Sequence, residues 1–184
     1  MSRVAILVAV GFEEIEALTV VDLLRRSNID ADLVSITGER YVTSSHGIKI
    51  QADQLFEEVD FHKVDMIVLP GGMPGTENLE KYEPLMLQLD TFNKNKKYIS
   101  AICAAPSILG HRGMLVGRNA CCFPEYESQL TGANVSKNEV EISDHIITSR
   151  GMGCSIPFGL AIVKRFLGQA VSDELKKKII YQNS

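Results

Sequence analysis

The chain has 184 residues, of which 45% are hydrophobic and 23% are charged, and its formal net charge is -4. This length fits one globular domain, residues 1–184, and the slightly acidic balance gives no electrostatic reason to expect nucleic acid as a partner. The four cysteines show neither a CxxC spacing nor a paired histidine spacing, so we expect no metal site and no disulfide framework. Free thiols are typical of a reducing compartment, and the expected location is the cytoplasm.

The first half of the chain alternates between strand and helix. Its pattern predicts a buried strand, a helix, a second strand and a hairpin, over residues 3–10, 13–27, 31–36 and 42–50. The hairpin is expected to turn at Ser45-His46-Gly47. The first apolar run is too short to span a membrane and leads into a helix rather than a cleavage site, so no membrane partner is expected.

The second half continues this alternation. Further strands are predicted at residues 66–69, 97–102 and 142–148, and helices at 82–92, 156–166 and 173–180. Ser172 is the expected N-cap of the last helix. The segment 111–140 shows no readable periodicity, and no strand is assigned to it. Strands that alternate with helices predict an α/β fold, in which a mostly parallel sheet is covered by helices on both faces.

Cys103 stands at a predicted corner between a strand and a helix. The apolar run that ends at Ile102 is followed by Pro106, and proline suits the first turn of a helix because its φ is fixed and it lacks an N–H. Open α/β sheets bind ligands at the carboxyl ends of their strands, and a helix N-terminus stabilises a thiolate. Cys103 is therefore a candidate nucleophile, while a small buried hydrophobe is the equally weighted alternative.

Two further loops are expected at the same edge of the sheet, because each follows a parallel strand. The first carries Glu13, Glu14 and Glu16, and the second carries Gly71 and Gly72. Acidic residues in a first helical turn also occur simply as partners of the helix dipole, and a Gly-Gly pair is often only a tight turn. The glycines match neither a P-loop nor a dinucleotide-binding fingerprint, so no cofactor is expected.

Four motifs stand out along the chain: Gly11-x-Glu13-Glu14-x-Glu16, Leu69-Pro70-Gly71-Gly72, Ala101-Ile102-Cys103-Ala104-Ala105-Pro106 and Thr148-Ser149-Arg150-Gly151. Taken together, they resemble the ThiJ/PfpI superfamily, in the branch of the parkinsonism-associated protein DJ-one and its bacterial relatives. The resemblance covers essentially the whole chain. It implies a flavodoxin-like three-layer sandwich, similar to class I glutamine amidotransferases, and a homodimer that pairs through the helix at 13–27 and the excursion at 41–51.

The resemblance also assigns roles to residues. It implies that Cys103 is a reactive cysteine on a nucleophile elbow and that Glu16 is a protonated glutamate hydrogen-bonded to it. Gly72 and Ala104 would supply backbone donors to an oxyanion, with Gly71 lining the site. The neighbouring amides and the helix N-terminus predict a low pKa for the Cys103 thiol. Three other cysteines are expected to be ordinary: Cys121, Cys122 and Cys154.

The chain departs from the family pattern at three positions. Phe123 stands before Pro124 where some relatives carry a histidine that completes a triad, and His111 is too far along the helix to replace it. His46 occupies a position that often holds an anion-binding arginine, so it is a candidate substrate-binding residue or simply a turn histidine. Ala104 stands where the protease branch has histidine, which argues against peptidase activity.

Three functions follow from the resemblance. The first is a cysteine-dependent glyoxalase or protein deglycase without a cofactor, acting on methylglyoxal or its adducts. The second is a redox sensor or stress-response chaperone in which Cys103 is oxidised to a sulfinate, since an accessible thiolate is susceptible to stepwise oxidation. The third is a binding domain with a vestigial site. The expected partners are accordingly a small aldehyde or an oxidant.

Overall fold

A seven-stranded sheet forms the centre of the molecule, which is a computed structural model that describes residues 2–181. The strand order is β10-β11-β7-β6-β1-β2-β5, and every pair of neighbours is parallel except β10 with β11. The strands are β1 (Arg3–Val8), β2 (Asp30–Ser35), β5 (Gln54–Leu55), β6 (Met66–Leu69), β7 (Tyr98–Ile102), β10 (Val140–Ser143) and β11 (Ile146–Ser149).

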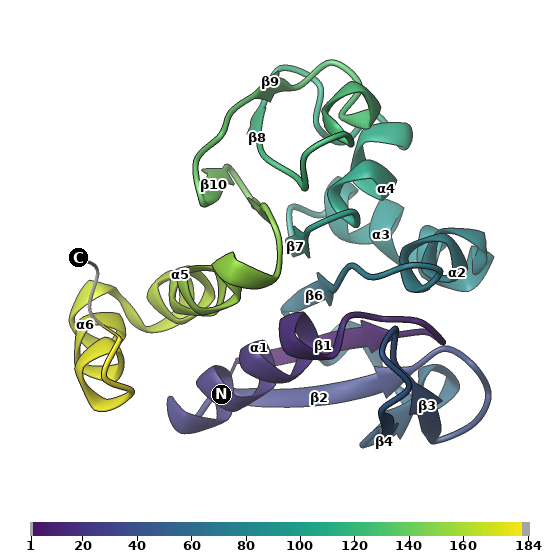
Figure 1. Cartoon of the computed structure of the whole chain (residues 1–184), viewed down its shortest axis with the longest axis horizontal. Coiled ribbons are helices and arrows are strands. Elements are labelled where there is room, and N and C mark those ends of the chain that lie inside the picture. The colour runs from purple at the N-terminus through teal and green to yellow at the C-terminus, as the bar shows by residue number, and fades with distance from the viewer. Residues whose placement is uncertain (1, 182–184) are drawn as a thin grey trace.

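Helices cover both faces of this sheet. On one face lie α1 (Glu14–Arg26), α5 (Ser155–Leu167) and α6 (Gln169–Lys178), and on the other lie α2 (Gly75–Lys81), α3 (Glu83–Lys94) and α4 (Pro106–His111). In Figure 1, β6 and β7 lie between α5 on one side and α3 on the other. The expected three-layer α/β sandwich with a mostly parallel sheet is therefore confirmed.

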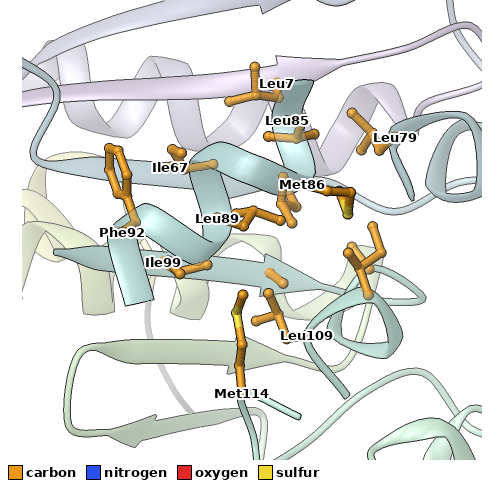
Figure 2. Close-up of a cluster of buried hydrophobic side chains, with 14 of the residues drawn as sticks. Leu7, Ile67, Leu79, Leu85, Met86, Leu89, Phe92, Ile99, Leu109 and Met114 are labelled. Carbon is orange, nitrogen blue, oxygen red and sulfur yellow. The ribbon is translucent and has the colours of Figure 1, made fainter. Parts of the chain in front are cut away.

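The central strands are apolar on both sides, because each of their faces is covered. Along β6, Ile67 and Leu69 belong to the core under α2, α3 and α4, whereas Met66 and Val68 belong to the core under α1, α5 and α6. Successive side chains of a strand point to opposite faces, so a four-residue apolar run supplies two cores. Figure 2 shows Leu7, Ile67 and Ile99 from three neighbouring strands facing the α3 side chains Leu85, Met86, Leu89 and Phe92.

A small hairpin is attached to the start of α1. It consists of β3 (Tyr41–Thr43) and β4 (Lys49–Gln51), which pair antiparallel as expected. The Gly11 N–H donates to Thr43 O at 2.8 Å, and the Ser45 N–H donates to Phe12 O at 2.8 Å. These two bonds bring the turn that carries His46 next to the first turn of α1.

The late strand predicted at 142–148 is wrong in its boundaries. The chain turns at Asp144, whose φ of 59° lies in the left-handed region, and the segment forms two antiparallel strands instead of one. An aspartate tolerates this conformation because its short polar side chain can bond locally. The apolar spacing of the segment gives no sign of the turn, since Ile142 and Ile146 lie on either side of it.

The predicted N-cap Ser172 is also wrong. The last helix begins at Gln169, directly after Gly168, which has a φ of 85° and also ends α5. Ser172 lies inside α6, where its hydroxyl donates to the Leu160 carbonyl at 3.0 Å and so joins the two helices.

The unassigned segment 111–140 contains two short strands, β8 (Asn119–Ala120) and β9 (Asn134–Val135), which pair with each other. Four single-turn 3-10 helices complete the fold: η1 (Phe56–Glu58), η2 (Phe61–Lys63), η3 (Glu127–Gln129) and η4 (Met152–Cys154). Across residues 2–181, none of the helices combines the length and apolar character needed to cross a bilayer.

Candidate functional site

Cys103 occupies a sharp corner between β7 and α4, as predicted. Its φ is 66°, a left-handed conformation that is unfavourable for a residue with a side chain and costs on the order of 1–3 kcal/mol. Two backbone hydrogen bonds hold the corner: the Cys103 N–H donates to Ser149 O at 3.0 Å, and the Phe123 N–H donates to Cys103 O at 2.8 Å. Such a strained corner lifts the side chain out of the strand and presents the sulfur at the edge of the sheet.

Glu16 lies beside this thiol, in the first turn of α1. Its side chain is buried with 1% exposure, and its Oε2 accepts a hydrogen bond from the Gly71 N–H at 2.8 Å. Its Oε1 is buried and has no hydrogen-bond partner among residues 2–181. Burial raises the pKa of Glu16 to about 7, against the lowering effect of hydrogen bonds from Gly71 and Cys103.

Gly71 is required by the close approach of these two side chains. A methyl group at this position would lie 2.6 Å from Cys103 Cβ and 2.9 Å from Glu16 Oε2. Cys103 Cβ is fixed by the backbone, and the Glu16 carboxyl is buried and bonded to the Gly71 N–H, so any side chain here would displace the pair. The Gly-Gly that follows β6 is therefore part of the site as well as a turn.

The prediction of a low pKa for the Cys103 thiol is wrong. Burial, repulsion from the Glu16 carboxylate and the hydrogen bond to it together raise the pKa of Cys103 to about 12, although the Ala104 and Gly72 amides lower it. Burial also raises the pKa of Cys122 to about 12 and that of Cys121 to about 11. The helix that follows Cys103 spans only six residues, so its N-terminus does not outweigh desolvation.

The two neighbouring groups titrate as a pair. Burial raises the pKa of Glu16, and the Glu16 carboxylate in turn adds to the burial that raises the pKa of Cys103, so the pair keeps one proton after the first has left. Because Glu16 and Cys103 hydrogen-bond each other, placing the negative charge on sulfur requires the proton to move to the carboxyl oxygen. The Gly72 and Ala104 amides favour the thiolate form.

His46 lies in a separate, more exposed cluster. Its Nδ1 is 3.0 Å from Glu14 Oε1 and 3.7 Å from Glu13 Oε2, and the Ser45 hydroxyl donates to Glu13 Oε2 at 2.9 Å. The ring nitrogen thus faces carboxylates rather than Cys103. Glu13, Glu14 and His46 offer ligand atoms within 4.8 Å of one another, but they already satisfy each other, and the cluster by itself does not point to a metal.

No histidine of residues 2–181 hydrogen-bonds Cys103. His111 pairs with Glu80 at 2.6 Å, and His145 bridges Asp144 and Asn93. His111, which the sequence placed too far along the helix to reach Cys103, thus pairs with Glu80 instead.

Two residues of the site surroundings were not identified from the sequence. Gly151 is buried, and a methyl group there would lie 4.0 Å from Cys103 Sγ and 3.3 Å from Cδ2 of Phe123. Phe123 was noted only as the replacement of a histidine, yet its ring and the sulfur both border Gly151. The Thr-Ser-Arg-Gly motif was the available signal, since it spans the end of β11, the strand beside β7.

Comparison with known proteins agrees with this geometry. The model of the DJ-1/PfpI family matches residues 2–165. The chain is 34% identical over 180 residues to Protein DJ-1 homolog B of Arabidopsis thaliana, covering 97% of this chain and 41% of that protein. It is 30% identical over 187 residues to the Parkinson disease protein 7 homolog of Danio rerio, covering 98% of each. The chain spans less than half the length of the two Arabidopsis thaliana relatives that it matches.

Solved structures of DJ-1 proteins have the same fold as this chain. Oxidized DJ-1 of Toxoplasma gondii matches with a TM-score of 0.95 and 30% identity, covering 100% of both chains. DJ-1beta of Drosophila melanogaster matches with a TM-score of 0.92 and 29% identity, again over 100% of both chains. The flavodoxin-like architecture, the elbow cysteine with its buried glutamate and the family match all point the same way, and the chain belongs to the DJ-1/PfpI family.

Proposed function

We propose that Cys103 and Glu16 form a cofactor-free catalytic pair that converts methylglyoxal, or its adducts on proteins, to lactate. One observation carries this proposal: the buried carboxyl of Glu16, whose pKa is raised to about 7, and the partly exposed thiol of Cys103 meet at Gly71, beside two backbone amides. A carboxyl with a pKa near the working pH is suited to both accepting and donating a proton. Glu13, although only three residues away, has no contact of this kind with the thiol.

The reaction begins when sulfur attacks the aldehyde carbon of methylglyoxal. The thiol proton passes to Glu16, the C–S bond forms, and the resulting oxyanion is stabilised by the Gly72 and Ala104 amides. Glu16 returns the thiol proton to this oxyanion, which completes the hemithioacetal. As a carboxylate again, Glu16 moves the proton from the hemithioacetal carbon to the neighbouring carbon through an enediol, which yields a thioester of lactate. Water hydrolyses the thioester and regenerates the thiol, so the net change is the addition of one water to methylglyoxal.

Turnover by this pair is expected to be slow. A positioned general base typically contributes about 10²–10⁴-fold, and no histidine assists the thiol among the described residues. The elbow cysteine has Ala104 after it, which supports the view that the protein is not a peptidase.

The test is steady-state lactate production from methylglyoxal, with chiral analysis of the product. Wild-type protein should produce lactate, and Cys103→Ser should produce none above the uncatalysed rate. Cys122→Ser is the matched control, because Cys122 is a buried thiol with a similarly raised pKa but without a neighbouring carboxyl bond. Lactate production by Cys103→Ser at the wild-type rate would refute the proposed nucleophile.

A second function, oxidation sensing by the same cysteine, is favoured by the buried Glu16. Peroxide converts the thiolate to a sulfenate with release of water, and a second peroxide yields the sulfinate. The protonated carboxyl of Glu16 would then donate a hydrogen bond to a sulfinate oxygen. Mass spectrometry after peroxide titration should show two added oxygens on Cys103 before any on Cys154, the other partly exposed thiol.

We further propose that the protein forms a homodimer and acts in the cytoplasm. All four cysteines are free, which fits a reducing compartment. Several large apolar side chains are exposed on α1 and the β3–β4 hairpin, where relatives are expected to pair: Ile15, Leu18, Tyr41 and Ile48. Light scattering should give a mass near twice 20.3 kDa at micromolar concentration, and a monomer mass would contradict the dimer.

A further inference from the structure

Gly151 borders both the Cys103 sulfur and the ring of Phe123. A β-carbon there would lie 4.0 Å from Sγ, 3.3 Å from Cδ2 and 3.9 Å from Cε2 of Phe123. The φ of Gly151 is 161°, an extended conformation that any residue can adopt. The glycine is therefore needed for the space that it leaves rather than for its backbone conformation.

The ring of Phe123 is held at this position by an ordered backbone. Its N–H donates to Cys103 O at 2.8 Å, and its carbonyl accepts from the Tyr126 N–H at 3.1 Å. The preceding residue, Cys122, is buried in the core. The side chain nevertheless remains 45% exposed, so a large apolar surface faces solvent beside the reactive sulfur.

The surroundings of the sulfur thus include polar groups and apolar groups. The polar groups are Glu16, the Gly71 backbone and the Gly72 and Ala104 amides. The apolar groups are Gly151 and the ring of Phe123. When sulfur attacks a carbonyl carbon, the oxygen is bound by the amides, and the substituent on that carbon is left for the apolar groups.

We infer that Phe123 and Gly151 determine specificity at Cys103 and select electrophiles that carry a flat apolar substituent, such as an aryl group. The inference deepens the proposed function, on which its catalytic part rests, and names α-oxoaldehydes with an aromatic or extended apolar substituent as the preferred substrate class. An aromatic pair contributes about 0.5–1.5 kcal/mol beyond the area that it buries, which corresponds to a preference of roughly twofold to tenfold.

The first arm of the test requires no turnover. Alkylation of Cys103 by iodoacetamide and by its N-phenyl derivative is followed by mass spectrometry, and the ratio of the two rates is compared between variants after correction for the ratio measured with free cysteine. Wild-type protein should favour the phenyl reagent by roughly threefold or more. Phe123→Ala should abolish this preference, and Phe123→Leu should retain part of it. Gly151→Ala should slow the phenyl reagent more than the small one.

Leu87→Ala is the matched control, because it removes another exposed apolar side chain, 56% exposed, from α3. It should keep the wild-type ratio. The second arm compares turnover of phenylglyoxal and methylglyoxal, measured as mandelate and lactate, in the same variants. The specificity ratio should fall in Phe123→Ala as the alkylation ratio does.

The outcomes separate the two proposals. Loss of the alkylation preference in Phe123→Ala without any turnover by the wild type would support the role of Phe123 in specificity and refute the proposed enzyme. Turnover with an alkylation ratio that is unchanged in Phe123→Ala and Gly151→Ala would overturn the specificity inference and leave the enzyme intact.

Discussion

Glu14 and Glu16 lie two residues apart in the first turn of α1, and both are buried. Their pKa values are nevertheless shifted from the ordinary value of a glutamate in opposite directions. Burial raises the pKa of Glu16 to about 7. Burial also disfavours the charge of Glu14, but its own backbone N–H, the Ser44 hydroxyl and His46 outweigh that effect and lower the pKa. The first glutamate is held as a carboxylate, and the second is poised to exchange a proton.

The difference comes from what each carboxyl faces. Glu14 lies just under the surface, against a hairpin turn whose His46 is 67% exposed. Glu16 faces the interior of the sheet edge, where only one backbone N–H and a thiol are in reach. The same helical turn therefore carries two glutamates with different roles. Glu14 joins α1 to the hairpin turn, and Glu16 can take part in chemistry.

The largest expected difference between the two glutamates is in turnover. Glu16→Gln keeps the shape of the side chain but cannot carry a proton between atoms of the substrate, so lactate production should fall by about 10²–10⁴-fold. Glu13→Gln and Glu14→Gln should retain most of the wild-type rate. Steady-state lactate assays of the three variants make the comparison, and equal losses in all three would show that Glu16 has no special role.

The pH dependence of stability should separate the two sites next. Because the pKa of Glu16 is about 7 in the folded protein against 4.5 as the ordinary value, the folded state binds the extra proton between these limits. The contribution of Glu16 to the free energy of unfolding should therefore be largest below about pH 4.5 and should fall as the pH rises to 7. The total loss should be about 3 kcal/mol, since one pKa unit corresponds to ~1.36 kcal/mol. Urea unfolding from pH 5 to pH 8 measures this loss.

Glu16→Gln is the reference for that measurement, since it removes the titrating group. The free energy of unfolding of the variant should increase relative to that of the wild type as the pH rises, and this change should occur between pH 5 and pH 7. A difference that does not change with pH would mean that burial does not control the acidity of Glu16.

Gly71→Ala should disturb the Glu16 site and spare Glu14. The added methyl group would lie 2.6 Å from Cys103 Cβ and 3.1 Å from its sulfur, so the pair must move apart. Overpacking of this kind typically costs about 1–3 kcal/mol, and Cys103 alkylation should change as well. Gly153→Ala is the control, because a methyl group there meets nothing within 4 Å. Equal behaviour of the two variants would contradict the tight packing.

The smallest effect is expected at the exposed cluster. His46→Ala removes the partner of Glu14 at 3.0 Å, and a largely exposed pair of this type contributes between about 0 and 1 kcal/mol. The Glu14 carboxyl should then titrate at a higher pH, which NMR of the side-chain carboxyl can follow. A large loss of lactate production in this variant would show that His46 takes part in the reaction, as an anion-binding residue would.

Much of the fold was determined by local sequence. The apolar run of β6 and the change of pattern around Pro106 predict a buried strand and a strand-to-helix corner, and both are present. The turn at Asp144 and the start of α6 at Gln169 were missed, because an aspartate at positive φ and a glycine shared by two helices leave the apolar spacing unchanged. The spacing of apolar residues indicates which face of an element is buried. A turn that leaves the same face buried does not change this spacing and therefore cannot be predicted from it.

The raised pKa expected for a buried Glu16 beside Cys103 agrees with the structure, whereas the low pKa expected for the Cys103 thiol does not. The resemblance to the family motifs singled out Cys103, Glu16 and Gly71, whereas the residue pattern alone left each of them a simpler explanation. The pKa values depend on burial and on which carboxyl meets which partner across 55 residues of chain, as in the bond from Gly71 to Glu16. Only the folded arrangement showed that burial of the thiol raises its pKa to about 12, and only it set the ring of Phe123 next to Gly151. Desolvation and charge–charge distance are properties of three-dimensional neighbours, and those neighbours exist only after the sheet has assembled.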